Sequence, residues 1–175
     1  MENSKIIRPK FFAPAAIMTS PEGKIFLVGK KGKLTIPTGK METSDKDSSE
    51  ALERELAEEI KYRRTGAGIK VSIIRSLGTI IYDKDSPEAA VFEIICCTVD
   101  ESDLIFNEGG ETFSMWADLD AVSELEELDR LAKDGISLYL DYLYKHLASA
   151  ARKNGGENEE GIPLCDEEEM ESQSY

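Results

Sequence analysis

The chain has 175 residues and a net charge of −14, with 41% hydrophobic and 32% charged residues, a composition ordinary for a soluble globular domain. An acidic body argues against a broad surface for duplex nucleic acid, which needs clustered lysine and arginine. No apolar run approaches the roughly 18 residues of a membrane span, and we expect no signal peptide. The three cysteines and the single histidine lack zinc-ligand spacing, and free thiols suit the cytoplasm, where we expect the protein.

Acidic residues crowd the C-terminal end of the chain. From Asn154 onward there are eight acids and no base: Glu157, Glu159, Glu160, Asp166, Glu167, Glu168, Glu169 and Glu171. The stretch is also rich in Gly, Asn and Ser and poor in large apolar groups, so we expect it to be disordered. The sequence therefore predicts a domain over residues 1–152 and an acidic tail over 153–175.

Hydrophobic patterning predicts alternating strands and helices along the body. In chain order we expect two strands within 11–33 around a Pro-Glu-Gly turn, a short strand at 34–37, a loop over 38–47 and a helix over 48–64 with Asp47 or Ser48 as its N-cap. After them we expect one long or two shorter strands over 69–82 with a kink near Gly78, strands over 86–100 and 111–119, and a mostly helical segment over 121–152. In the last segment Ile136, Leu140, Leu143 and Leu147 form one helical stripe. This order predicts a mixed β-sheet covered by helices on two sides.

The stretch RELAEEI at residues 54–60 places three glutamates within two turns of the first helix. They gather beside the apolar face formed by Leu52, Leu56 and Ile60, not opposite it. Like charges at this spacing repel by a few tenths of a kcal/mol per pair. One interpretation is a solvated helix face. The other is a missing counter-ion, since carboxylates at the edge of a core are the oxygen ligands that Mg²⁺ or Mn²⁺ requires.

The residues around this helix follow a longer pattern of strand, glycine loop and acidic helix. The loop IPTGK contains Gly39 and leads toward the complete core R-E-U-x-E-E at residues 54–59, where U is a bulky aliphatic residue. This resembles the box of the Nudix hydrolase family, G-x5-E-x7-R-E-U-x-E-E-x-G-U. The later stretch ETFSMWADLDAV is similar to one that many family members carry. The resemblance implies an α/β/α sandwich with a mixed β-sheet between helices.

The chain departs from the box in its loop and at its helix end. Thr38 stands where the family usually has a glycine, and Lys61 replaces the glycine expected after the glutamates, so we expect the helix to continue past it. The spacing over 39–54 is one residue longer than the pattern, so the loop is expected to bulge. The middle glutamate of the box then has no matching residue; Asp47 is the first candidate for its place and Asp45 the second.

The resemblance implies roles for the matching residues. Glu55, Glu58 and Glu59, with the Gly39 carbonyl, would hold Mg²⁺ or Mn²⁺. Arg54 would pair with an acid of the loop or helix and brace the site. The metal would bridge the phosphates of a diphosphate and orient a water, whose proton a nearby carboxylate would accept.

Five further residues enter on weaker grounds. Glu111, preferred over Glu108, is a candidate for an additional ligand or base, with an exposed loop acid as the competing interpretation. Lys40, Tyr82 and Trp116 are candidates for substrate binding. For Trp116 we favour a core anchor over a base-stacking ring, and a tyrosine at a strand end such as Tyr82 is common without any such role.

The function implied is a Mg²⁺- or Mn²⁺-dependent pyrophosphohydrolase that cleaves a nucleoside diphosphate linked to another group X. Candidate substrates are a nucleoside triphosphate, a nucleotide sugar, a dinucleoside polyphosphate and a capped RNA end. The alternative is a Nudix-fold binding or regulatory module with weak or no turnover. A remoter alternative is an acidic scaffold acting through its tail. We expect the partner to be a nucleotide, and we expect no binding to a membrane. A homodimer is the one protein assembly that we consider.

Overall fold

The computed structural model describes residues 11–30, 32–84, 89–107 and 112–154. The chain divides into one unit up to Tyr142 and a second from Leu143, and the sheet and its coverings belong to the first. The described part of the second unit is the C-terminal portion of helix α3 (Arg130–Asn154). That helix reaches two residues into the predicted tail, and the rest of the tail lies outside the described residues.

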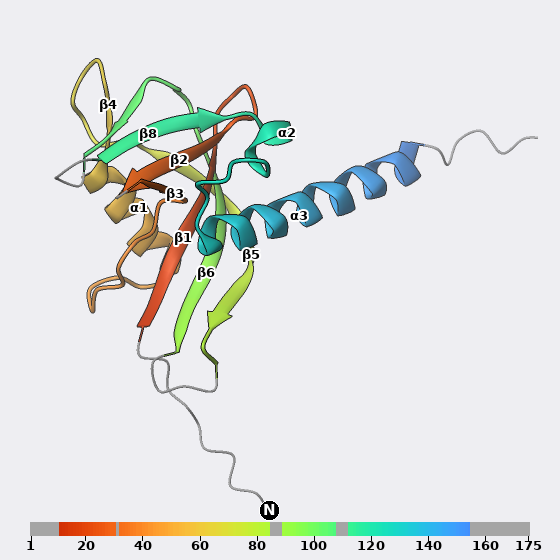
Figure 1. The fold of residues 1–175 in the computed structure, drawn as a ribbon, viewed down its shortest axis with the longest axis horizontal. Coiled ribbons are helices and arrows are strands. Elements are labelled where there is room, and N and C mark those ends of the chain that lie inside the picture. The colour runs from red at the N-terminus through yellow and green to blue at the C-terminus, as the bar shows by residue number, and fades with distance from the viewer. Residues whose placement is uncertain (1–10, 31, 85–88, 108–111, 155–175) are drawn as a thin grey trace, which may run out of the picture. The chain divides into compact units, whose positions relative to one another are not determined.

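Six strands of the described residues form one mixed sheet (Figure 1). They are β1 (Phe11–Thr19), β2 (Ile25–Lys30), β3 (Lys33–Thr35), β5 (Val71–Tyr82), β6 (Ala90–Val99) and β8 (Thr112–Ala117). The order is β3-β2-β1-β6-β5, with β8 also pairing with β2. Strands β1 and β6 run parallel and the other pairs are antiparallel. The sheet therefore has the mixed character that the element order predicts.

Each face of the sheet is covered by a helix. On one face, the buried Leu52 and Leu56 of α1 (Ser48–Glu59) join a core cluster with strand residues such as Met18 and Ile95. On the other face, Gly135 of α3 lies so close to the sheet that an added Cβ would stand 2.9 Å from Ile36 Cδ1. A short helix, α2 (Leu119–Val122), precedes α3. The arrangement confirms the predicted sheet between helices.

Helix α1 begins where its capping residues predict. Asp47 is the N-cap, and its side chain accepts a hydrogen bond of 2.9 Å from the backbone N–H of Glu50. The Glu50 carboxylate in turn accepts one of 2.7 Å from the backbone N–H of Lys46. The first bond satisfies an N–H group that the first turn of a helix leaves without a partner, and the second ties the residue before the cap to the helix.

The end of α1 differs from the prediction. The helix ends at Glu59, and Ile60–Tyr62 forms strand β4, which pairs with β7 (Leu104–Phe106) in a separate two-stranded sheet. Continuation past Lys61 is therefore wrong. Ile60 is fully buried and takes extended backbone angles, so its tertiary contacts override the local helical pattern.

The predicted stripe on α3 is buried only at its first member. Ile136 is buried, but Leu140 is 37% exposed and Leu147 70% exposed. The face that packs lies earlier and is shifted around the helix, and it comprises Leu131, Ala132, Ile136 and Tyr139. The predicted helical period is confirmed, but the predicted core face is wrong. Within the described ranges, no helix is long and apolar enough to cross a membrane.

Truncating the core residue of the glutamate stretch tests this arrangement. Leu56 is 1% exposed, so Leu56→Ala is expected to lower the free energy of unfolding by about 2–5 kcal/mol, measured by urea denaturation. The same substitution at Leu147 serves as the matched control and is expected to change it by less than about 0.5 kcal/mol. Equal losses for the two variants would contradict the placement of α1 against the sheet.

Candidate functional site

The Arg54 guanidinium ties the loop before α1 to the helix itself. Its Nε and Nη2 donate to the two carboxylate oxygens of Asp45 at 3.2 and 3.0 Å. Nη2 also donates to the backbone carbonyl of Lys40 at 2.8 Å. The Asp45 side chain is only 4% exposed and accepts a further bond of 2.7 Å from the backbone N–H of Glu42. A two-pronged bond of this kind fixes direction as well as distance.

This pairing determines which acid of the loop serves Arg54. The hydrogen bond from Arg54, with help from the Glu42 backbone, lowers the pKa of Asp45 below its usual range, and Asp45 in turn raises the pKa of Arg54. The expectation that Arg54 pairs with a loop acid is met. The partner is Asp45, whereas Asp47 is occupied as the helix cap. Which of the two stands in for the middle glutamate of the box stays a prediction.

The glutamates of α1 lie in two rows, because residues four apart share a helix face. Glu58 follows Arg54 by four residues, and Glu59 follows Glu55. The Arg54 Nη1 atom lies 3.0 Å from Glu55 Oε1, 3.7 Å from Glu58 Oε1 and 3.9 Å from Glu42 Oε1. Arg54 thus supplies positive charge close to two of the three glutamates, Glu55 and Glu58. The interpretation that these acids lack a counter-ion is corrected to that extent.

Gly39 and Glu55 meet, as the sequence pattern predicts. A Cβ added to Gly39 would stand 3.0 Å from Glu55 Cγ and 3.2 Å from Glu55 Cβ, so a larger residue would push the glutamate or the loop away. The Gly39 N–H donates to the Pro14 carbonyl at 2.8 Å, which fixes the loop to β1. Glycine therefore allows the loop and the Glu55 side chain to approach closely here.

The donor chemistry of this cluster suits a hard divalent ion. Carboxylates beside a glycine backbone are oxygen donors of the type that Mg²⁺ takes. Among the described residues, however, no group of three or more His, Cys, Asp or Glu side chains is arranged to hold a metal. The residue types fit the ion, and the ligand set stays a prediction.

A small cavity adjoins the row of Glu55 and Glu59. Its volume is about 140 Å³, and it is lined by Val28, Thr35, Ile36, Pro37, Thr38, Glu59 and Phe106. Thr38 directly precedes Gly39, so the cavity continues from the glycine loop. Within the described part of the chain, the buried Thr35 hydroxyl has no hydrogen-bond partner. Such a group costs about 1–3 kcal/mol of stability when left unpaired.

Thr35 and Phe106 are among the lining residues that sequence reasoning did not place at the site. Thr35 ends the short strand β3, where a threonine looks like any β-branched strand residue. Phe106 ends β7, a three-residue strand that the hydrophobic pattern did not reveal. The sequence offers one signal for Thr35, which is a polar residue in the apolar run directly before the glycine loop.

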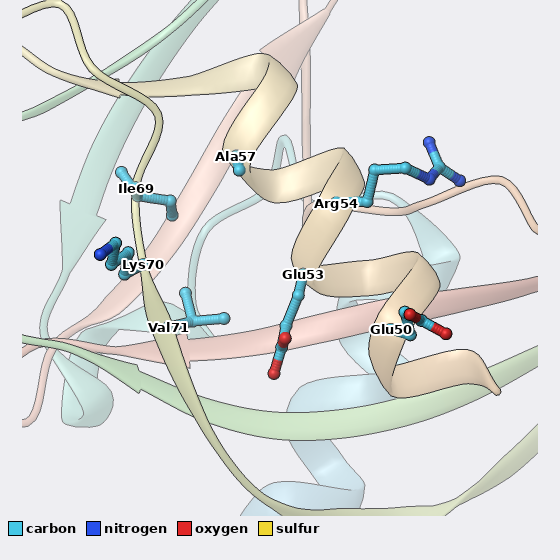
Figure 2. A pocket seen from close by; sticks show the side chains of 7 residues that line it. All are labelled: Glu50, Glu53, Arg54, Ala57, Ile69, Lys70 and Val71. Carbon is cyan, nitrogen blue, oxygen red and sulfur yellow. The ribbon is translucent and has the colours of Figure 1, made fainter. Parts of the chain in front are cut away.

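A larger hollow lies on another side of α1 (Figure 2). Its volume is about 460 Å³, and it is lined by Glu50, Glu53, Arg54, Ala57, Ile69, Lys70 and Val71. Figure 2 shows Glu53 extending between the helix and Val71, while the Arg54 guanidinium points away from that segment. None of the three glutamates of the motif lines this hollow. Its larger volume therefore does not make it the candidate site.

Two further predicted residues, Tyr82 and Trp116, make contacts with residues outside the glutamate row. The Tyr82 hydroxyl donates to Asp134 of α3 at 2.9 Å, which places it on the opposite face of the sheet from α1. Trp116 packs against Phe26 with ring centroids 4.9 Å apart, and its Nε1 donates to the Ser102 carbonyl, which matches the core-anchor interpretation.

Three other predicted positions complete the comparison. Lys40 offers its backbone carbonyl to Arg54, and its side chain is exposed. Glu108 and Glu111 lie outside the described residues.

The charge on Asp45 gives a test that depends on pH. Because its native pKa is lowered, its stabilising effect is complete above the unfolded value of about 3.9 and is lost as pH falls through the native value. Asp45→Asn should lower the melting temperature at pH 7, and the gap to the parent should close below about pH 4. Asp47→Asn is the matched control, since asparagine caps a helix as well as aspartate does. A pH-independent gap would contradict the Arg54 pairing.

Comparisons with known proteins agree with this geometry. The model of the NUDIX domain family matches residues 10–140. A MutT protein of Methanosarcina mazei Go1 superposes with a TM-score of 0.58 at 15% identity, over 86% of this chain and 99% of that one. A UDP-X diphosphatase gives 0.60 at 19%, over 82% and 66%. The NUDIX domain of Shewanella oneidensis NrtR, complexed with ADP ribose, gives 0.60 at 16%, over 81% and 94%.

These identities are low enough that the superpositions show the fold alone. No curated protein matches the chain. The family model spans most of the sequence, including the glycine loop, the glutamate helix and the first part of α3. The chain therefore belongs to the NUDIX domain family.

Proposed function

We propose that this protein is a Mg²⁺- or Mn²⁺-dependent pyrophosphohydrolase of nucleoside diphosphates linked to another group. One observation carries the proposal: Glu55 lies against Gly39, while Glu59, on the same row, lines a cavity that continues from that loop. Phosphate chemistry and a binding space thus share one edge of α1. Family membership supports the same reaction class, since Nudix proteins are typically pyrophosphohydrolases.

In this proposal Glu55, Glu58 and Glu59, with the Gly39 carbonyl, hold the divalent ion. When bound, the ion neutralises charge on the diphosphate and lowers the pKa of a bound water. The chain's own residues position the reaction. Asp45 and Arg54 hold the loop and helix in register. One carboxylate of the row accepts the proton of the attacking water, with Glu111 proposed as an additional base.

The glutamates and the Gly39 loop do not determine the identity of the linked group X. Nudix domains bind nucleotide ligands, as the ADP-ribose complex among the structural neighbours illustrates. A triphosphate, a nucleotide sugar, a dinucleoside polyphosphate and a capped RNA end all contain the required diphosphate. Because the metal and glutamates contact only that shared part, selectivity must come from the surrounding loops and cavity.

A binding module without turnover is the second candidate, and one observation favours it. Arg54 Nη1 contacts Glu55 at 3.0 Å and approaches Glu58, so an internal cation already engages carboxylates that catalysis requires. In that case nucleotides would bind, and no diphosphate would be cleaved with either metal. Phosphate and nucleotide release from a substrate panel, with Mg²⁺ and with Mn²⁺, distinguishes the two candidates.

Removing the charge of Glu55 tests the enzyme proposal. Glu55→Gln is expected to lower turnover about a hundred-fold or more, the scale seen when one electrostatic catalytic group is lost. It should also reduce the rise in melting temperature that Mg²⁺ produces in the parent, because a native-state ligand stabilises by RT ln(1 + [L]/Kd). Turnover and melting curves measure the two effects.

Glu53→Gln is the matched control for this experiment. Glu53 belongs to the same helix and undergoes the same substitution, but it lines the other hollow. Its turnover and Mg²⁺ response are expected to equal those of the parent. If Glu55→Gln also keeps both properties, the row is a solvated helix face and the proposed function fails.

A further inference from the structure

The C-terminal part of α3, which begins the second unit of the chain, carries an exposed apolar face. Tyr144 is 76% exposed and Leu147 is 70% exposed, the two highest values for large apolar side chains among the described residues. The two lie three residues apart and so share a helix face, which the half-buried Leu143 borders. Single exposed apolar residues are common, but two so open on one face form a candidate docking surface.

The charge of this helix segment is opposite to that of the chain as a whole. Residues 143–154 include Lys145, Arg152 and Lys153 and no acid, whereas the complete chain has a net charge of −14. The stretch that follows, residues 155–175, has eight acids and no base. A basic segment and an acidic one so close in sequence attract each other, because screening acts only beyond about 10 Å at 0.1 M salt. The exposed face therefore suits an acidic partner that also carries apolar groups.

The acidic tail contains an apolar pair with the spacing that this face requires. Ile162 and Leu164 are two residues apart, between the acids of 157–160 and those of 166–169. In an extended segment such a pair points to one side, about 6.6 Å apart. Leu143 and Leu147 are four residues apart, which is about 6 Å along the helix. The pair can therefore pack on this face while the flanking acids lie against the basic segment.

The linker between the helix and this pair also has a suitable length. From Asn154 back to Leu147 the helix rises about 10 Å, and a chain packed beside it lies roughly 10 Å from its axis, which gives a span of about 15 Å. Ile162 follows Asn154 by eight residues, with glycines at 155, 156 and 161. A glycine-rich chain of this length has a root-mean-square extension of about 14–17 Å. A linker that matches its span gives the tail its highest effective concentration at the helix.

We propose that the exposed face of α3 formed by Leu143, Tyr144 and Leu147 is a docking surface, and that its occupant is residues 160–166 of the same chain. Apolar contacts of Ile162 and Leu164 hold the segment, and its acids balance the charge of the basic helix end. The composition that predicts disorder for the free tail agrees with this, because such segments order when they bind. The inference does not rest on the proposed function, since neither side includes a residue of the glutamate row.

A second copy of the helix is a less favourable occupant. Pairing two such faces would place two segments of charge +3 against each other, counting Lys145, Arg152 and Lys153 on each. The tail offers apolar contact together with opposite charge. By covering this face, the tail shields it from other chains.

A nitroxide spin label on Cys165 tests the contact in the full chain. Cys96 and Cys97 are buried, and burial raises the pKa of the Cys96 thiol to about 11, so a thiol-reactive label is directed to Cys165. In an extended segment Cys165 points away from the side of Leu164, which keeps the label out of the contact. The label broadens the NMR resonances of nearby backbone amides. Docking is expected to broaden residues 143–147 at least twofold more than residues 152–154, whereas a tail that is only tethered gives the opposite gradient.

Two tail variants provide a matched comparison. Ile162→Ser combined with Leu164→Ser keeps the length and charge of the tail but removes its apolar pair, so the strongest broadening should move to the helix end. Met170→Ser removes an apolar residue outside the proposed contact and should leave the strongest broadening over 143–147. Raising the salt from 0.1 to 1 M shortens the screening length from about 10 to about 3 Å and should weaken the broadening over 143–147 at least twofold.

Three results would overturn the inference. Strongest broadening at the helix end of the parent would show a tethered tail that does not dock. An unchanged pattern in the double serine variant would show that Ile162 and Leu164 make no contact. Broadening of an unlabelled, ¹⁵N-enriched chain by a spin-labelled, unenriched one would assign the face to a second copy. None of these measurements involves turnover, so their failure is separate from a failure of the proposed function.

Discussion

The bond between Arg54 and Asp45 is the constraint on which the rest of the site depends. It joins residues nine apart in sequence across the boundary between a loop and a helix, and it is nearly closed to solvent on the Asp45 side. Exposed ion pairs contribute little, but a two-pronged pair with a shielded carboxylate sets a geometry. Once the loop is held in this way, Gly39 is brought against Glu55, and Thr38 is brought to the edge of the cavity.

The same arginine also changes how the acidic helix should be understood. Its third nitrogen lies among Glu42, Glu55 and Glu58, so one side chain both ties down the loop and balances charge on the helix. Glu59 lies one turn beyond Glu55 and faces the cavity. The helix therefore has a braced, charge-balanced part around Arg54 and an end that borders the cavity, and the proposed function places the diphosphate between them.

The sequence was sufficient for the parts of this structure that follow from local rules. Period-two and period-3.6 patterns located β1, β6, β8 and α1, and the capping preference of Asp47 located the start of α1. The motif spacing brought Gly39 and Glu55 together correctly. The predictions that were wrong concern features that depend on contacts between distant segments. Ile60 leaves the helix because it pairs with Phe106, and no local pattern announces this.

The separate roles of Asp45 and Asp47 could not be predicted for a related reason. Both are acids of the same loop, and the extra residue in that loop removed the register on which the motif relies. Two competing demands decided the outcome: the first turn of α1 needs a cap, and Arg54 needs a partner, and each acid satisfies only one of them. The cavity could not be predicted from the sequence, because its walls come from four segments that only the folded chain assembles.

The irregular course of β5 has a consequence for the behaviour of this protein in a crowded solution. β5 is the terminal strand of the sheet order, and it is 12 residues long with Ile74 and Ile81 exposed. A straight strand of that kind offers an unpaired row of backbone groups on which another chain can assemble a fibril. Two register shifts, between Ile73 and Arg75 and between Ser76 and Gly78, interrupt that row, and Gly78 adopts a φ of 142° that only glycine takes readily. The irregularity therefore protects the chain against aggregation at the edge of its own sheet.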